Sequence, residues 1–132
     1  MKVLVDTSVW SLALRRSAQD NEITEVLSGL IRESMVVMTG PIRQEVLSGI
    51  SSDAVYNELK AKLRSFDDLE ITTTDYETAA EFYNTCRKNG VQGSHIDFLI
   101  CAVAHNYNLL IFTTDKDFQH YAQHLPIRLY GS

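Results

Sequence analysis

Short runs of apolar residues alternate along this chain with longer segments in which apolar side chains recur at helical spacing. The short runs predict strands, and the longer segments predict helices. Strands are expected at residues 2–5, 35–38, 69–71, 109–112 and 127–129, and helices from about residue 9 and at 21–34, 41–47, 52–63, 74–89, 93–106 and 116–123. Strands that alternate with helices need crossover connections, which favour a mostly parallel sheet with helices on both faces. The pattern therefore predicts an α/β fold whose central sheet has about five strands.

The length and composition of the chain suit one globular domain spanning residues 1–132. Hydrophobic residues make up 45% of the chain, and no apolar stretch approaches the roughly 20 residues that a bilayer-spanning helix needs. The first residues lead straight into a strand without the apolar segment of a secretory signal, so a cytoplasmic location is expected. Cys86 and Cys101 lack the spacing of a zinc site and are expected to be reduced core thiols.

Four acidic residues stand at strand ends and helix starts of the predicted sheet. Asp6 and Asp115 come directly after apolar strands, whereas Glu45 and Asp97 fall in the first or second turn of predicted helices. Ligands of such sheets bind beyond the carboxyl ends of the strands. Because helix starts can face the same rim, the spacing is compatible with one cluster of four carboxylates.

Each of these acids also has an explanation as a helix cap. Asp6 and Asp115 could be helix N-caps, and Ser94 with Asp97 forms an S-x-x-D pattern close to a capping box. The set as a whole favours a cation, because several carboxylates at one rim repel each other unless a positive charge compensates. Carboxylate ligands without histidine or thiolate favour Mg²⁺ or Mn²⁺.

The predicted metal ligands are Asp6, Glu45, Asp97 and Asp115. Asp6 and Asp97 are assigned to the most central ion, Asp115 to the same ion or a second one, and Glu45 to a second ion or a bound water.

Several neighbours of the acids are candidates for supporting roles. Thr7, Ser8 and Thr113 flank the carboxylates and can either orient them, together with bound water, or cap helices. Asp117 follows Asp115 by two residues, and two interpretations stay open for it: a water-mediated ligand, or an acid that complements a helix N-terminus.

The net charge of −5, from 12 basic and 17 acidic residues, at first argues against a nucleic-acid partner. Two divalent cations would add +4 and bring −5 to −1, so the charge does not decide the partner. Arg43, two residues before Glu45, and His95, two residues before Asp97, are the candidate substrate contacts closest to the acids. Arg15–Arg16 is a further candidate phosphate contact, and Trp10 a candidate base-stacking residue.

At these residues the chain resembles the PIN-domain ribonucleases, and in particular the VapC-type toxins of toxin–antitoxin operons. The resemblance rests on the opening segment VLVDTSVW, on Glu45, on the helix segment DFLICA that starts at Asp97, and on the closing segment LIFTTDKDF. Cys101 stands where the family has a small alanine, a difference that touches no acidic position.

The resemblance implies an α/β/α sandwich, a homodimer, and cleavage of RNA that depends on Mg²⁺ or Mn²⁺. It also implies a VapB-like antitoxin that covers the groove and can present an arginine to the acids. Two alternatives within the superfamily stay open, a nuclease that cuts DNA or a particular nucleic-acid structure, and a catalytically silent binding module. A receiver domain fits poorly, because Asp6 has no acidic neighbour after its strand.

Overall fold

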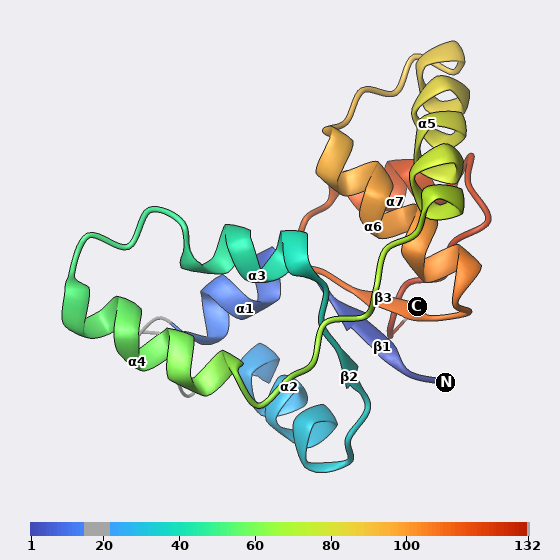
Figure 1. Ribbon diagram of the computed structural model, residues 1–132. Helices are drawn as coiled ribbons and strands as arrows, with labels where there is room; N and C mark the ends of the chain where they lie inside the picture. The colour runs from blue at the N-terminus through green and yellow to red at the C-terminus, as the bar shows by residue number, and fades with distance from the viewer. Residues whose placement is uncertain (15–21, 132) are drawn as a thin grey trace.

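The computed structural model describes residues 1–14 and 22–131 (Figure 1), so the Arg15–Arg16 pair lies outside the described residues. The elements in chain order are β1 (Val3–Val5), α1 (Thr7–Ala13), α2 (Glu22–Arg32), β2 (Val36–Val37), α3 (Gly40–Leu47), α4 (Asp53–Leu63), α5 (Thr73–Lys88), α6 (His95–Asn106), β3 (Leu110–Phe112) and α7 (Asp117–Ala122). Each predicted helix is present, with ends within a few residues of the prediction.

The three strands form a parallel sheet in the order β2-β1-β3. Val3 pairs with Val36 of β2 and with Leu110 of β3, and Val5 pairs with Phe112. The residues of the central strand β1 are at most 1% exposed, as expected of a parallel strand that is covered on both faces. The predicted α/β class is confirmed.

The predicted number of about five strands is wrong for the part of the chain that the structure describes. The segments near Leu69 and Leu129 each form only one isolated bridge, Met38 with Asp68 and Ile111 with Leu129. Both segments lie at the outer edges of the sheet and leave it after a single pairing, the first toward the start of α5. A run of three apolar residues looks the same in the sequence whether it forms a ladder or a single bridge, so the pattern overestimated the strands.

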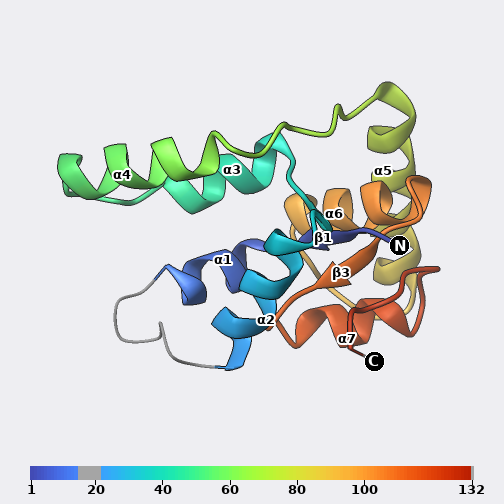
Figure 2. The same cartoon turned by 90° about the horizontal axis from the view of Figure 1, so that it is seen from below.

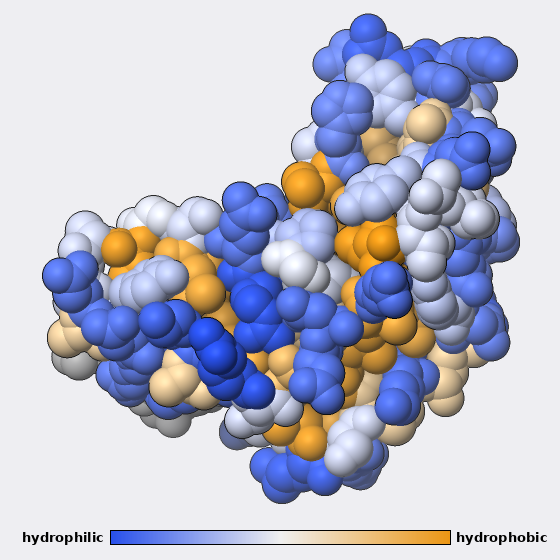
Figure 3. Space-filling model, in the orientation of Figure 1, coloured by the Kyte–Doolittle hydropathy of each residue, from blue (hydrophilic) through white to orange (hydrophobic). Residues whose placement is uncertain are grey.

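The helices form two groups around the sheet, α1 to α4 on one side and α5 to α7 on the other (Figures 1 and 2). This arrangement is the α/β/α sandwich that the resemblance implied. The space-filling view shows a mostly polar surface, with apolar atoms gathered along the α5–α6 side and between α3 and α4 (Figure 3). Among the described residues, none of the helices combines the length and the apolar character that crossing a bilayer requires.

Helix α6 is the most buried helix of the core. Its residues from Phe98 to Ala104 are all buried, which places it between α5 and the sheet. Asp97 stands immediately before this buried stretch, in the first turn of α6. The burial of Phe98 in the core therefore fixes the position of Asp97, one of the predicted ligands.

A second aspartate, Asp75, is 2% exposed in the first turn of α5. Its carboxylate accepts hydrogen bonds from the backbone N–H and the hydroxyl of Thr72, from Asn106 Nδ2 at 2.8 Å and from the Tyr107 hydroxyl at 3.3 Å. Burial acts to raise the pKa of Asp75, but these hydrogen bonds outweigh it and the pKa lies below its ordinary value. Asp75 is thus a satisfied structural carboxylate.

Candidate metal centre

Asp6 lies at the carboxyl edge of the sheet, directly after β1, and is 5% exposed. Its Oδ2 atom accepts hydrogen bonds from Ser8 Oγ at 2.8 Å and from Thr113 Oγ1 at 2.9 Å. Thr113 follows β3, so the parallel pairing of the two strands brings these side chains together. Asp6 occupies the N-cap position of α1, but its side chain makes no capping hydrogen bond. The capping explanation of Asp6 is therefore wrong.

Three other carboxylates lie beside each other at the same edge. One carboxylate oxygen from each of Asp97, Asp115 and Asp117 lies within 4.8 Å of the other two. Asp97 and Asp115 are half-buried, and Asp117 is exposed. The backbone N–H of Asp117 donates to Asp115 Oδ1 at 2.9 Å. Asp117 thus lies beside two of the expected ligands and is also the first residue of helix α7, so its position is compatible with either interpretation.

Thr113 connects these two parts of the cluster. Its hydroxyl donates to Asp6 and accepts a hydrogen bond from the backbone N–H of Asp115 at 3.0 Å. Ser8 and Thr113 lie 3.2 Å apart through their hydroxyl oxygens, and the backbone N–H of Thr114 donates to Ser8 Oγ. The hydroxyls predicted to orient carboxylates at this rim thus form a short chain of hydrogen bonds between the end of β1 and the end of β3.

The electrostatics of Asp97 reflect this crowding of acids. Burial raises the pKa of Asp97, a hydrogen bond from Tyr121 opposes that effect, and the charges of Asp6 and Asp115 raise the pKa further. The net pKa lies above the ordinary value of an aspartate. The ionised cluster is therefore short of positive charge, which is the condition that a bound cation relieves.

Glu45 lies at the margin of this cluster. It is exposed on α3, and its Oε1 atom accepts a hydrogen bond from Thr7 Oγ1 at 2.9 Å. Thr7 is the residue after Asp6, so this contact links α3 to the end of β1. Of the four predicted ligands, the structure brings Asp6, Asp97 and Asp115 within one electrostatic environment and leaves Glu45 at its edge.

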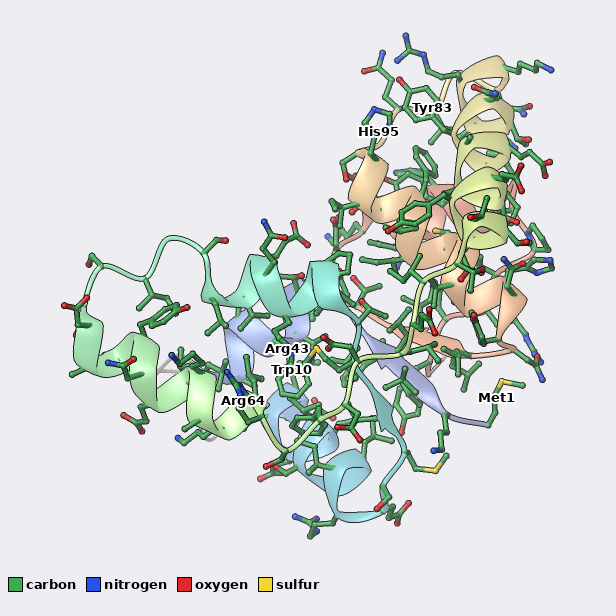
Figure 4. All side chains as sticks on the ribbon, viewed as in Figure 1. Met1, Trp10, Arg43, Arg64, Tyr83 and His95 are labelled. Carbon is green, nitrogen blue, oxygen red and sulfur yellow. The ribbon has the colours of Figure 1, made fainter. Side chains whose placement is uncertain are left out.

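Arg43 does not face the acids. Its guanidinium forms an ion pair with Asp68 at 3.0 Å and donates to the backbone carbonyls of Leu63 and Phe66. Figure 4 shows Arg43 beside Trp10 and Arg64, between α3 and the segment after α4. Its nitrogens hold the chain together, so the predicted substrate contact is replaced by a structural one.

His95 and Trp10 also have aromatic partners within the fold. The ring of His95 stacks on Tyr83 with centroids 5.1 Å apart, on the α5–α6 side of the molecule (Figure 4). Trp10 is 3% exposed and packs against Phe66 with centroids 5.3 Å apart. A buried indole cannot stack on a nucleobase. His95 is exposed, and one face of its ring is covered by Tyr83.

Tyr121 is the site residue that the sequence prediction missed. Its hydroxyl donates to Asp97 Oδ2 at 2.7 Å, although the side chain is fully buried. A buried tyrosine usually needs a partner for its hydroxyl. Tyr121 lies one helical turn after Asp117, and that spacing was the available signal that its hydroxyl faces the acids.

The donor set fits a hard divalent cation. The clustered ligands Asp97, Asp115 and Asp117 offer carboxylate oxygens only, the atoms that Mg²⁺ and Mn²⁺ prefer. Asp6 adds a further carboxylate whose Oδ2 is held in place by two hydroxyls. The arrangement can hold a cation and present it at an open edge of the sheet, as the exposure of Asp117 indicates.

Comparison with known proteins agrees with this architecture. A PIN-domain family model matches residues 3–123. VapC ribonuclease Mb1587 from Mycobacterium bovis is 30% identical over 120 residues, which cover 88% of each chain. The crystal structure of FitAcB from Neisseria gonorrhoeae matches with a TM-score of 0.78 at 22% identity, over 98% of this chain and 96% of that chain. The crystal structure of VapBC2 from Rickettsia felis, bound to a DNA fragment from the promoter, matches with a TM-score of 0.79 at 16% identity, over 98% of this chain and 97% of that chain.

Proposed function

Because the chain belongs to the PIN-domain family and is related to VapC ribonucleases, we propose that it is an endoribonuclease that depends on Mg²⁺ or Mn²⁺. It hydrolyses RNA phosphodiester bonds as the toxin of a VapBC-type pair. The resemblance read from the sequence motifs is confirmed by the family match. The observation that carries the proposed chemistry is the group of three carboxylates whose oxygens lie within 4.8 Å of one another, beside Asp6.

Each acid has a defined part in this proposal. Asp97, Asp115 and Asp6 hold the central cation, with Asp117 as a direct or water-mediated ligand. Glu45, held by Thr7, stands at the rim where a second ion or a water would lie. The chemistry that a divalent cation supplies when bound is acidification of a water nucleophile and neutralisation of charge on the scissile phosphate.

The other residues of the site orient these carboxylates. Ser8 and Thr113 donate to the same oxygen of Asp6, so they fix the direction in which its other oxygen points. Among the described residues, no hydrogen bond involves Asp6 Oδ1, which leaves that atom for a cation. Attack by water leaves a 5′-phosphate and a 3′-hydroxyl, whereas attack by the RNA 2′-hydroxyl leaves a cyclic phosphate. The ends of the products therefore report the nucleophile.

A VapB-like antitoxin is the proposed protein partner. A groove of about 330 Å³ between α1, α2 and α4 is lined by apolar side chains that include Trp10, Leu27 and Leu63. An apolar groove of this kind suits a helix or extended segment of another chain. We further propose a homodimer that acts in the cytoplasm, with residues 1–132 forming one nuclease domain.

RNA cleavage by the purified chain tests the proposed function. Labelled RNA is incubated with the wild-type chain in the presence of Mg²⁺ or Mn²⁺, and again with chelator added. The Asp6→Asn variant is assayed in the same way, as is the control Glu58→Gln, which changes an exposed acid on α4. Cleavage is expected only with metal, and is expected to be lost in Asp6→Asn and kept in Glu58→Gln. Equal cleavage of a DNA of matched sequence would instead favour the DNA-directed alternative. Chelator-resistant cleavage would contradict the metal chemistry.

A further inference from the structure

We propose that Tyr121 is a positioning residue of the carboxylate cluster, whose hydroxyl orients Asp97 and thereby sets the affinity of the cluster for a divalent cation. The inference rests on the metal site of the proposed function and extends it to a residue outside the acidic motifs. It starts from the contact between the Tyr121 hydroxyl and Asp97 Oδ2, a 2.7 Å hydrogen bond between two helices. This bond holds the Asp97 carboxylate in one orientation within the group of acids.

The ring of Tyr121 is held firmly enough to fix that hydroxyl. It is 0% exposed and packs against Phe98 at 4.9 Å and Phe118 at 5.1 Å between ring centroids. Phe98 is the neighbour of Asp97 on α6, and Phe118 is the neighbour of Asp117 on α7. The ring of Tyr121 therefore packs between the two helices that carry these acids and holds its hydroxyl beside Asp97.

Gly93 supports the same role from the loop before α6. A Cβ atom added at this position would meet the Tyr121 hydroxyl and would lie 2.8 Å from its ring carbon Cζ and 2.9 Å from Phe98 Cζ. The backbone at Gly93 thus closes over the hydroxyl end of the ring, where only a residue without a side chain fits. The phenol oxygen is enclosed on this side, so the ring cannot move toward the loop to leave Asp97.

The chemistry of a phenol suits this position. Arg or Lys would also donate to Asp97, but each would bring a positive charge that competes with the cation. A tyrosine hydroxyl supplies one neutral donor, so it orients the carboxylate and leaves the negative charge of the cluster intact. Partners of metal ligands act in this way in other sites, where their loss typically costs about 10- to 100-fold in metal affinity or activity.

Calorimetric titration of Mn²⁺ into the metal-free full chain tests the inference. Tyr121→Phe keeps the ring and its packing and removes only the hydroxyl, so its dissociation constant for Mn²⁺ is expected to rise about 10-fold or more. The matched control is Tyr107→Phe, which removes another tyrosine hydroxyl bonded to a carboxylate, that of Asp75. It is expected to bind Mn²⁺ like the wild type. Gly93→Ala keeps the hydroxyl but displaces it, and is expected to weaken binding as well.

The dependence of RNA cleavage on Mn²⁺ gives a second measurement. In Tyr121→Phe the half-saturating Mn²⁺ concentration is expected to rise, while the rate at saturating Mn²⁺ stays within a few fold of the wild type, because the ligands themselves are unchanged. Wild-type affinity in Tyr121→Phe would overturn the inference. So would unfolding of Tyr121→Phe while Tyr107→Phe folds, because the hydroxyl would then serve stability.

The two proposals fail in different ways. A chain that binds Mn²⁺ with the expected order of affinities but leaves RNA intact would overturn the proposed function and keep the role of Tyr121. A chain that cleaves RNA with the same Mn²⁺ dependence in wild type and Tyr121→Phe would do the reverse. Absence of Mn²⁺ binding by the wild type would overturn both the metal site and the positioning role.

Discussion

Helices α5 and α6 begin with the same sequence pattern, yet their first turns have opposite electrostatics. Thr72 and Asp75 begin α5, and Ser94 and Asp97 begin α6, each pair with a hydroxyl at the N-cap and an aspartate three residues later. Asp75 turns back and accepts a hydrogen bond from the backbone N–H of Thr72, which completes a capping box. In α6 only half of that box exists, because Ser94 accepts from the backbone of Asp97 while the Asp97 carboxylate accepts from Tyr121 instead.

The surroundings of the two carboxylates explain the difference. Asp75 has donors from Thr72, Asn106 and Tyr107, and its pKa lies below the ordinary value. Asp97 is desolvated beside Asp6 and Asp115, and the hydrogen bonds from Tyr121 and Ser94 do not offset these effects, so its pKa lies above the ordinary value. In α5, the fold supplies hydrogen-bond donors for the aspartate three residues after the N-cap. The donors at α6 do not offset the burial of Asp97 and the charges beside it, which points to a ligand that is not part of the chain.

The largest expected contrast is in activity. Asp97→Asn should lower RNA cleavage by at least about 100-fold, since loss of a direct ligand should exceed the typical loss of a residue that only supports a ligand. Asp75→Asn should keep wild-type cleavage per folded molecule. Single-turnover rates at saturating Mn²⁺, normalised to the folded fraction by circular dichroism, measure both. Equal losses in the two variants would mean that the two aspartates share a structural role.

For stability, the two variants should show the reverse order, with the larger loss in Asp75→Asn. Asp75→Asn replaces an acceptor for several donors by an amide, so Asn106 and Tyr107 lose good partners and the free energy of unfolding should fall by roughly 2–3 kcal/mol. Urea unfolding of the metal-free protein measures this loss, with Asp97→Asn as the comparison. A smaller loss in Asp75→Asn than in Asp97→Asn would contradict the distinction drawn between the two helix starts.

The same comparison shows what the sequence could and could not predict. The strand and helix pattern located each helix and the central sheet, because burial imposes its period directly on the residues. It also gathered Asp6, Asp97 and Asp115 at one edge, since parallel strands place their carboxyl ends together. The pattern could not tell the first turn of α5 from that of α6, because both read as a hydroxyl followed by an aspartate.

The predictions that failed share one cause, which is that each depends on contacts between residues far apart in the sequence. Arg43 is close to Glu45 in the sequence, but it faces the backbone of Leu63 and Phe66 across the fold. Tyr121 reaches Asp97 from another helix, 24 positions along the chain. The two missing strands likewise depend on how far an edge segment continues along its neighbour. Partners of this kind are set by tertiary packing, which a local pattern does not contain.

The smallest expected effect is the response of metal-free stability to pH. For Asp97 the folded pKa lies above the unfolded value near 3.8, so the folded state holds its proton to higher pH than the unfolded chain does. Stability should therefore fall as the pH rises from that value through the raised pKa, and Asp97→Asn should lack this contribution. The gain in Asp97→Asn at neutral pH should be below about 1 kcal/mol, because the group is partly exposed and solvent screens its charge.

Asp75 should give the opposite slope on the acid side. Its folded pKa lies below the unfolded value of 3.8, so its contribution is present above that value and is lost as the pH falls through the lowered pKa. Urea unfolding from pH 2.5 to 7, with and without Mn²⁺, separates the two aspartates. Mn²⁺ should remove the loss of stability at higher pH, because it binds the carboxylate cluster of the folded state and not the unfolded chain. It should leave unchanged the loss of stability at acid pH that comes from Asp75. If Mn²⁺ changed the stability at acid pH and left the stability near neutral pH as it was, the cation would bind elsewhere than beside Asp97.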